Sequence, residues 1–275
     1  MDDFQRMEIA EFGSLPLSKK INLASSLASG HRPSVFFSIL ISYLVLFSIC
    51  GLLSTVFDFS ALLPFGANLQ VTTAASTVGA VFGLALGTVI WVFLFSFFAV
   101  GICALVLHHL KGQKVENTVG LLLSPWSRFS TLIISVGIWA GLFLIVGVVA
   151  SMFIRIPFFI GWFLVYLIEC ALISALICAC NFMAEDDFAA PLDAALIPLQ
   201  VIREHLSGWL SVAFLYALAN LPGMVIFALA VFLAPYSGIA SMLVSLMAAV
   251  YFAFVAVFCF FFAALTYLQS KEENT

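Results

Sequence analysis

One acidic residue of this sequence stands deep in an apolar stretch: Glu169, near the middle of residues 156–183. If that stretch crosses a bilayer, its carboxyl group is costly unless it is paired, hydrated or protonated. Asn220 and Tyr251 stand near the centres of two later apolar stretches, and both side chains can hydrogen-bond a carboxyl group. Pro222 has no N–H, so one backbone carbonyl of its helix loses its usual donor. These four residues predict a polar cluster at mid-membrane.

Such a cluster has two interpretations. Glu169 could couple proton or cation movement in a small transporter or channel. It could instead be a protonated side chain that hydrogen-bonds a neighbouring helix, which contributes about 1 kcal/mol. Transporters usually carry more intramembrane polar residues and paired broken helices. This chain has one acid at depth and one such break, Pro222-Gly223, so the sequence favours the packing role and leaves coupling as the alternative.

Other residues with reactive side chains form no recognisable site. The six cysteines all fall inside apolar stretches and have the character of small packing residues. No phosphate-binding glycine loop, zinc-protease helix or serine nucleophile elbow occurs. We therefore expect no enzyme, no catalytic residue, no metal and no cofactor. Four histidines map to the segments that we place on the inner side of the membrane: His31, His108, His109 and His205.

The elements that position these residues follow from composition. Of the 275 residues, 64% are hydrophobic and 9% are charged, whereas soluble domains have roughly 45–50% apolar and about 25% charged residues. A soluble fold cannot cover this much apolar surface, so the sequence predicts a membrane protein. The net charge is −4 and no basic patch occurs, so we expect no nucleic-acid partner.

Six apolar stretches are long enough to cross a bilayer, since about 20 helical residues span its ~30 Å hydrocarbon core. We therefore predict an all-α, polytopic transmembrane bundle of six helices. A cytoplasmic or interfacial segment (1–34) precedes the six-helix domain (35–268), and a cytoplasmic tail (269–275) follows it. The six stretches are residues 35–57, 78–108, 129–153, 156–183, 209–233 and 238–267.

The distribution of cations orients this bundle. If the N-terminus is inside, the outer segments hold only Arg155, and the inner segments hold all the other basic residues. This bias predicts an N-in, C-in protein of the cell (inner or cytoplasmic) membrane. The inner cations are Arg6, Lys19, Lys20, Arg32, Lys111, Lys114, Arg128, Arg203 and Lys271.

An amphipathic segment precedes the first, third and fifth stretches, at residues 15–32, 115–128 and 188–209. Segments of this kind lie in the headgroup layer, and tryptophan is enriched there. The order of interfacial element, helix, turn and helix thus occurs about three times. It indicates either internal duplication or the ordinary amphipathicity of inner segments. The predicted interfacial residues are Arg32, Trp126, Arg128, Arg203 and Trp209.

The last third of the chain resembles a known group. The residues concerned are Asp186-Asp187, then Ala194, Ala195 and Leu196, then Arg203 and Trp209. Their layout resembles an uncharacterised bacterial family of six-helix inner-membrane proteins, similar to the membrane domain of some glycerophosphodiester phosphodiesterases. The resemblance implies the fold and the location. The soluble phosphodiesterase domain of the fused members has no counterpart here, so no such activity is implied.

Small residues recur at helical spacing on three of the stretches. They let helix backbones approach closely, which drives helix association in lipid. We therefore expect a non-enzymatic scaffold, assembly factor or accessory subunit, with membrane lipids and other subunits or copies of itself as partners. A lipid-binding membrane protein is a further alternative to the transporter. The small residues are Gly79, Gly83 and Gly87, then Gly137 and Gly141, then Ser241 and Ser245.

Overall fold

All the regular secondary structure that the structure describes is helical, which confirms the all-α prediction. The computed structural model describes residues 12, 15–30, 32–54, 74–113, 115, 117–153, 159–185, 192–233 and 236–272. The helices are α2 (Leu17–Gly30), α3 (Arg32–Ser54), α4 (Ala74–Leu110), α5 (Thr118–Leu122), the 3-10 helix η3 (Ser124–Arg128), α6 (Phe129–Phe153), α7 (Phe159–Glu185), α8 (Asp193–Glu204), α9 (Leu206–Leu233) and α10 (Gly238–Glu272).

Five helical stretches in the described part of the chain are long and apolar enough to cross a membrane. A multi-pass membrane protein is therefore the class that the helices support. The predicted first span falls in α3, whose described apolar part is the shorter stretch Pro33–Ser42. The five are Ala85–Leu110, Thr118–Val149, Phe163–Glu185, Leu206–Ala230 and Ile239–Lys271.

The ends of the long helices differ from the predicted stretches by at most five residues. α6 has the predicted bounds, whereas α4 and α10 are longer than predicted. Hydropathy falls at the first polar residues, but α10 continues through Gln269 and Lys271. A helix can leave the hydrocarbon region without ending, because its backbone hydrogen bonds stay internal.

The described helices form three consecutive units, each with a short element followed by two long helices. Unit one is α2–α4, unit two is α5–α7 with η3, and unit three is α8–α10. The second long helices, α4, α7 and α10, all contact one another. The first long helix of each unit packs on the second long helix of a neighbouring unit: α6 on α4, α9 on α7 and α3 on α10. The order predicted along the sequence thus becomes a cyclic arrangement in space.

The short elements follow the same cycle. α5 and η3 contact α4, α8 contacts α7, and α2 contacts α10. We use the word seam for each of these three contacts. In a seam, the short element and the first long helix of one unit pack on the second long helix of a neighbouring unit. Gly101 shows how close the backbones come at the seam on α4: a Cβ added there would lie 2.6 Å from the Leu122 carbonyl oxygen. Only glycine fits this approach without a shift of the backbone.

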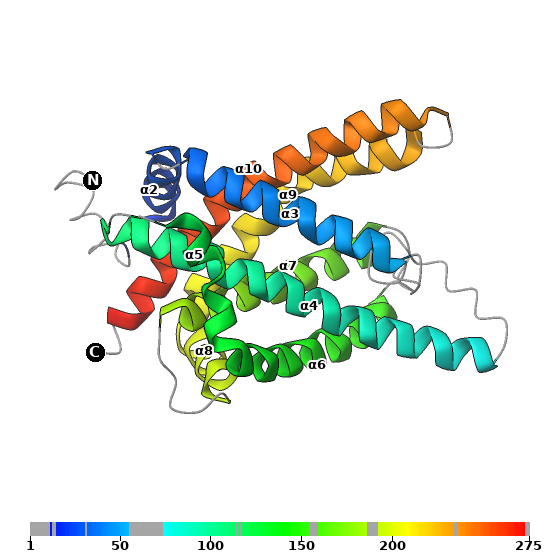
Figure 1. Cartoon of the computed structure of the whole chain (residues 1–275), viewed down its shortest axis with the longest axis horizontal. Coiled ribbons are helices and arrows are strands. Elements are labelled where there is room, and N and C mark those ends of the chain that lie inside the picture. Colours follow the sequence, from blue (N-terminus) through cyan, green and yellow to red (C-terminus); the bar gives the residue numbers. More distant parts are fainter. Residues whose placement is uncertain are drawn as a thin grey trace.

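The two ends of the bundle are packed differently (Figure 1). The end where α4, α7 and α10 terminate is named the lysine end, because Lys111 and Lys271 lie there. The opposite end, which holds the α9–α10 turn at Tyr236, is named the turn end. Most of the buried core belongs to the lysine-end halves of α4, α7 and α10. Toward the turn end, α9 and α10 run side by side and away from α4 and α6 (Figure 1).

Candidate functional site

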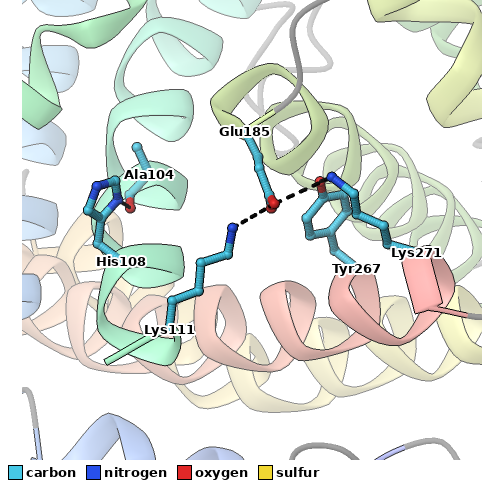
Figure 2. A network of polar contacts seen from close by, with 6 residues as sticks. All are labelled: Ala104, His108, Lys111, Glu185, Tyr267 and Lys271. Atoms are coloured by element: carbon cyan, nitrogen blue, oxygen red, sulfur yellow. Dashed lines mark hydrogen bonds and ion pairs between the residues drawn. The ribbon is translucent and has the colours of Figure 1, made fainter. Parts of the chain in front are cut away.

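The lysine end holds an ion triad in which one carboxylate meets two ammonium groups (Figure 2). Lys111, just after α4, donates from Nζ to Oε1 of Glu185, the last residue of α7, at 2.6 Å. Lys271, near the end of α10, approaches the same oxygen at 3.4 Å. The triad therefore ties together the second long helices of all three units.

Tyr267 supports the triad from α10. Its ring is fully buried and meets Phe182 of α7 edge-on, with the ring centroids 4.7 Å apart. Lys271 Nζ lies 3.4 Å from the Tyr267 hydroxyl and 5.8 Å from the ring centroid. The lysine is thus held by both a hydrogen bond and a cation–π contact.

Arg128 adds a third cation at the same place. It is the last residue of η3 and donates from Nη1 to the carbonyl oxygen of Met183, at 2.7 Å. The last carbonyls of a helix lack intrahelical donors, and the helix dipole favours cations there. The C-terminal end of α7 is therefore the point on which cations from units one, two and three converge.

This cluster joins the ends of three helices through ion pairs and hydrogen bonds. Lys111, Lys271 and Glu185 are partly exposed, and exposed ion pairs contribute only about 0–1 kcal/mol each. His108, which Figure 2 places beside the triad, binds the Ala104 carbonyl of its own helix through Nδ1, at 2.9 Å. In the described residues no three His, Cys, Asp or Glu side chains form a metal-binding group. His31, which the sequence places on the inner side with the other three histidines, lies outside those residues.

At mid-length of α9, two tyrosines from different helices bind its backbone. Tyr251 of α10 donates its hydroxyl to the Ala219 carbonyl at 2.9 Å, and Tyr166 of α7 donates to the Ala217 carbonyl. Pro222 follows directly in α9. The two phenols therefore fix α9 one turn before its proline, at carbonyls adjacent to the one that Pro222 leaves without a donor.

Asn220 and Tyr251 of the predicted polar cluster have different hydrogen-bond partners. The Asn220 amide donates to the Tyr216 carbonyl of its own helix at 2.7 Å. Tyr251 binds α9, as described above. Glu169 is half-buried in α7, and none of the described residues forms a hydrogen bond or ion pair with it. A cluster joined through Glu169 remains a prediction.

The predicted small-residue faces have different surroundings. Nothing lies within 4 Å of a Cβ added at Gly137 or Gly141 of α6. Gly87 of α4 is buried, whereas the surroundings of Gly79 and Gly83 lie outside the described residues.

The face of α10 that carries Ser241 and Ser245 meets α9 where it can be followed. Ser241 donates its hydroxyl to the Ala230 carbonyl at 2.8 Å, and Ser245 is half-buried. A Cβ added at Gly223 of α9 would lie 2.6 Å from the Phe252 ring. The α9–α10 pair is therefore a close helix hairpin over its length.

The two tryptophans predicted as interfacial anchors lie in opposite environments. Trp126 is 68% exposed and rests on Phe97 and Phe129, with ring centroids 6.2 and 5.3 Å away. Trp209 is only 3% exposed, so it is a core residue, and its place at the membrane interface stays a prediction. The preceding Gly208 brings α9 to within contact of Thr266 on α10, with 3.4 Å from a built Cβ to Thr266 Cγ2.

The two predicted interfacial arginines differ in what can be said of them. Arg203 is exposed near the end of α8. Arg32 begins α3, but its side chain lies outside the described residues.

An apolar cavity of about 470 Å³ lies between unit one and unit three. Its walls come from α2, α3, α9 and α10, and among the described lining residues only Ser25 has a polar side chain. The lining residues are Ser25, Ala28, Pro33, Phe36, Phe37, Ala219, Phe254, Val255, Val257 and Phe258.

Sequence reasoning missed Glu185 as a site residue. The signal was available, because Glu185 stands at the inner end of the fourth stretch and lysines stand at the inner ends of the second and sixth. Three even-numbered spans end on the same side of a membrane, so an acid and two bases at those ends can meet. Nothing in the sequence singles out Tyr166 or Gly101, whose roles depend on which helices are neighbours.

Comparison with known proteins adds no relative: no family model, curated protein or solved structure matches this chain.

Proposed function

We propose that this chain is a non-enzymatic protein of the cell membrane that acts as a scaffold, assembly factor or accessory subunit. It would do so through contacts of its helices with other membrane proteins or with copies of itself. The observation that supports this proposal best is an open face on α6. Atoms of a neighbouring helix occupy the space beside Gly101 and Gly223. No described atom occupies the space beside Gly137 and Gly141 of α6.

The open face of α6 has the shape of a helix-docking surface. Ile133, Gly137, Gly141, Ile145 and Val148 follow one another at three- or four-residue spacing, so they share one face. The two isoleucines and the valine are exposed, and nothing covers the glycines. The result is a shallow groove with glycine at its centre and branched side chains at its ends. A second transmembrane helix can approach closely along such a groove.

This face contrasts with the glycines that serve contacts inside the chain. The Leu122 backbone occupies the space beside Gly101, and the Phe252 ring occupies the space beside Gly223. Open glycine in a helix interior lowers helix stability by about 0.5–1 kcal/mol relative to alanine. Two open glycines on one face of α6 therefore have no packing partner in the described part of the chain and fit an external helix.

The double variant Gly137→Leu with Gly141→Leu tests this role. We expect the wild-type protein, purified in a mild detergent, to carry a partner or a second copy at fixed stoichiometry, as measured by light scattering and pull-down. The double variant should release it, because leucine fills the groove. Gly147→Leu is the matched control, since Gly147 is equally open but lies about 120° around the helix from Gly141. A monodisperse wild-type monomer without a partner would contradict the proposal.

The proposal includes six spans, with α3 as the first and both ends of the chain inside. α3 has 23 residues, enough for about 34 Å of helix. Lys111, Arg128 and Lys271 meet at the lysine end, and cations accumulate on the cytoplasmic side of membrane proteins. These observations support placing the lysine end in the cytoplasm.

A transporter or channel that uses Glu169 is the second candidate. A half-buried carboxyl group without a partner among the described residues supports it, because such groups mark ion and proton pathways. Proton- or cation-linked flux into liposomes should then occur with the wild-type protein and disappear in Glu169→Gln. Absence of wild-type flux, or equal flux in the variant, removes this candidate.

A further inference from the structure

The three seams of the bundle are built alike but are not filled alike. At the seam on α4, the Trp126 ring meets Phe97, and Phe129 meets Phe93 edge-on with centroids 6.0 Å apart. At the seam on α7, α9 begins with the buried Trp209. At the seam on α10, residues 15–54 contain no tryptophan, and the apolar cavity of about 470 Å³ lies there instead.

The cavity lies at the same level of the bundle as the contact between Phe97 and Trp126. Phe97, which carries the Trp126 ring, stands fourteen residues before Lys111 at the end of α4. Val257, which lines the cavity, stands fourteen residues before Lys271 near the end of α10. Lys111 and Lys271 meet in the ion triad, so the two positions lie at corresponding heights along their helices.

The cavity opens on the surface that lipid covers. Phe37 and Phe254 line it and are 58% and 48% exposed on the outside of the protein. It extends from α2 to Ala219, which lies at mid-length of α9 beside Pro222. One wall is therefore an interfacial helix, and the other end reaches the middle of the membrane.

We infer that this cavity binds one acyl chain of a membrane phospholipid, with the phosphate end beside α2. The volume falls within the roughly 300–1,000 Å³ of small-molecule sites. A hydrocarbon chain is thin and matches the apolar walls. The first turn of α2 carries Lys19 and Lys20, one to two turns before the lining residue Ser25, and α2 has no acidic residue. Lys20 Nζ lies 5.1 Å from the Phe12 ring centroid, and the positive charge of this turn complements a phosphate. The inference is independent of the α6 face.

Two variants test the site by filling it. Ala219→Leu places a larger side chain in the cavity. Ser25→Trp adds a large ring at the exposed rim of the cavity. Ala228→Leu is the matched control, because Ala228 is exposed on the same helix and does not line the cavity. The full-length protein is released from nanodiscs of phosphatidylglycerol and phosphatidylcholine, and bound phospholipid is counted by native mass spectrometry.

We expect the wild type and Ala228→Leu to retain one tightly bound phospholipid. Its occupancy should fall at least tenfold in Ala219→Leu and in Ser25→Trp, with thermal unfolding showing that each variant is folded. A wild type without retained phospholipid would overturn the inference. Equal retention by a folded Ser25→Trp variant would also overturn it. A photoreactive amino acid in place of Phe37 should cross-link to a lipid, and cross-linking to a protein instead would overturn the inference.

Discussion

The lysine end and the turn end of the same helices differ in what surrounds them. Near the lysine end, Phe261 of α10 is fully buried, and the ends of α4, α7 and α10 are joined by the ion triad. At the turn end, Phe232 of α9 is 64% exposed, and α9 and α10 pack chiefly on each other, as at Ser241. Both residues are phenylalanines, so the hydrophobicity of the side chain does not decide which of them is buried.

This difference indicates a division of labour along the bundle. In lipid, apolar side chains gain little by leaving hydrocarbon for a protein core, so packing and polar contacts hold helices together. These contacts concentrate at the lysine end and at the two tyrosines that bind α9. Toward the turn end more of the side-chain surface is exposed, as at Phe232.

The largest test of this comparison uses one substitution at both ends. Phe261→Ala should lower the free energy of unfolding by about 3–5 kcal/mol, because it leaves a cavity in the core. Phe232→Ala removes a ring from the lipid-facing surface and should change it by no more than about 0.5 kcal/mol. Unfolding in mixed micelles measures both values, and equal losses would erase the distinction between the ends.

A glycine substitution sharpens the comparison. In Gly101→Ala the new Cβ meets the Leu122 backbone, which cannot rotate away, so we expect a loss of about 1–3 kcal/mol. Gly137→Ala enters open space and should be neutral or stabilise α6 by up to about 1 kcal/mol. Melting temperatures of the two purified variants give the sign of each effect. A stable Gly101→Ala protein would mean that α5 does not pack against α4.

Removing one phenol tests the attachment of α9 between the two ends. Tyr251→Phe deletes the hydrogen bond to the Ala219 carbonyl, and such bonds between membrane helices average about 0.6 kcal/mol. Hydrogen exchange of the amides after Pro222 should accelerate more than that of amides near the start of α9. Uniform exchange along α9 would show that the phenol does not hold this point.

A similarly small effect is expected at the ion triad. Glu185→Gln leaves Lys111 and Lys271 without their shared carboxylate, yet both are partly exposed. The loss should not exceed about 1 kcal/mol. Salt screens exposed pairs, so melting curves of the wild type and the variant should converge at about 1 M salt. A large loss that salt does not reduce would assign the triad a role beyond a surface clamp.

The sequence predicted the helical class and the bounds of the long helices because these depend on local hydropathy. It could not predict neighbours, since the membrane-crossing helices are apolar all around and lipid hides which side faces protein. Trp126 and Trp209 illustrate this: both are tryptophans near the start of a long helix, but Gly208 brings only the second into the core. Tyr166 and Glu185 likewise have partners more than 50 residues away.

The most direct test of the account asks on which side of the membrane each end of the bundle lies. Gln113→Cys marks the lysine end after α4, and Ser237→Cys marks the turn end between α9 and α10; both positions are exposed. An impermeant maleimide should label Ser237→Cys in intact cells, and Gln113→Cys only after the membrane is opened. The wild type is the control for its own cysteines. Labelling of both variants from the same side would contradict a bundle that crosses the membrane, and reversed labelling would contradict a cytoplasmic lysine end.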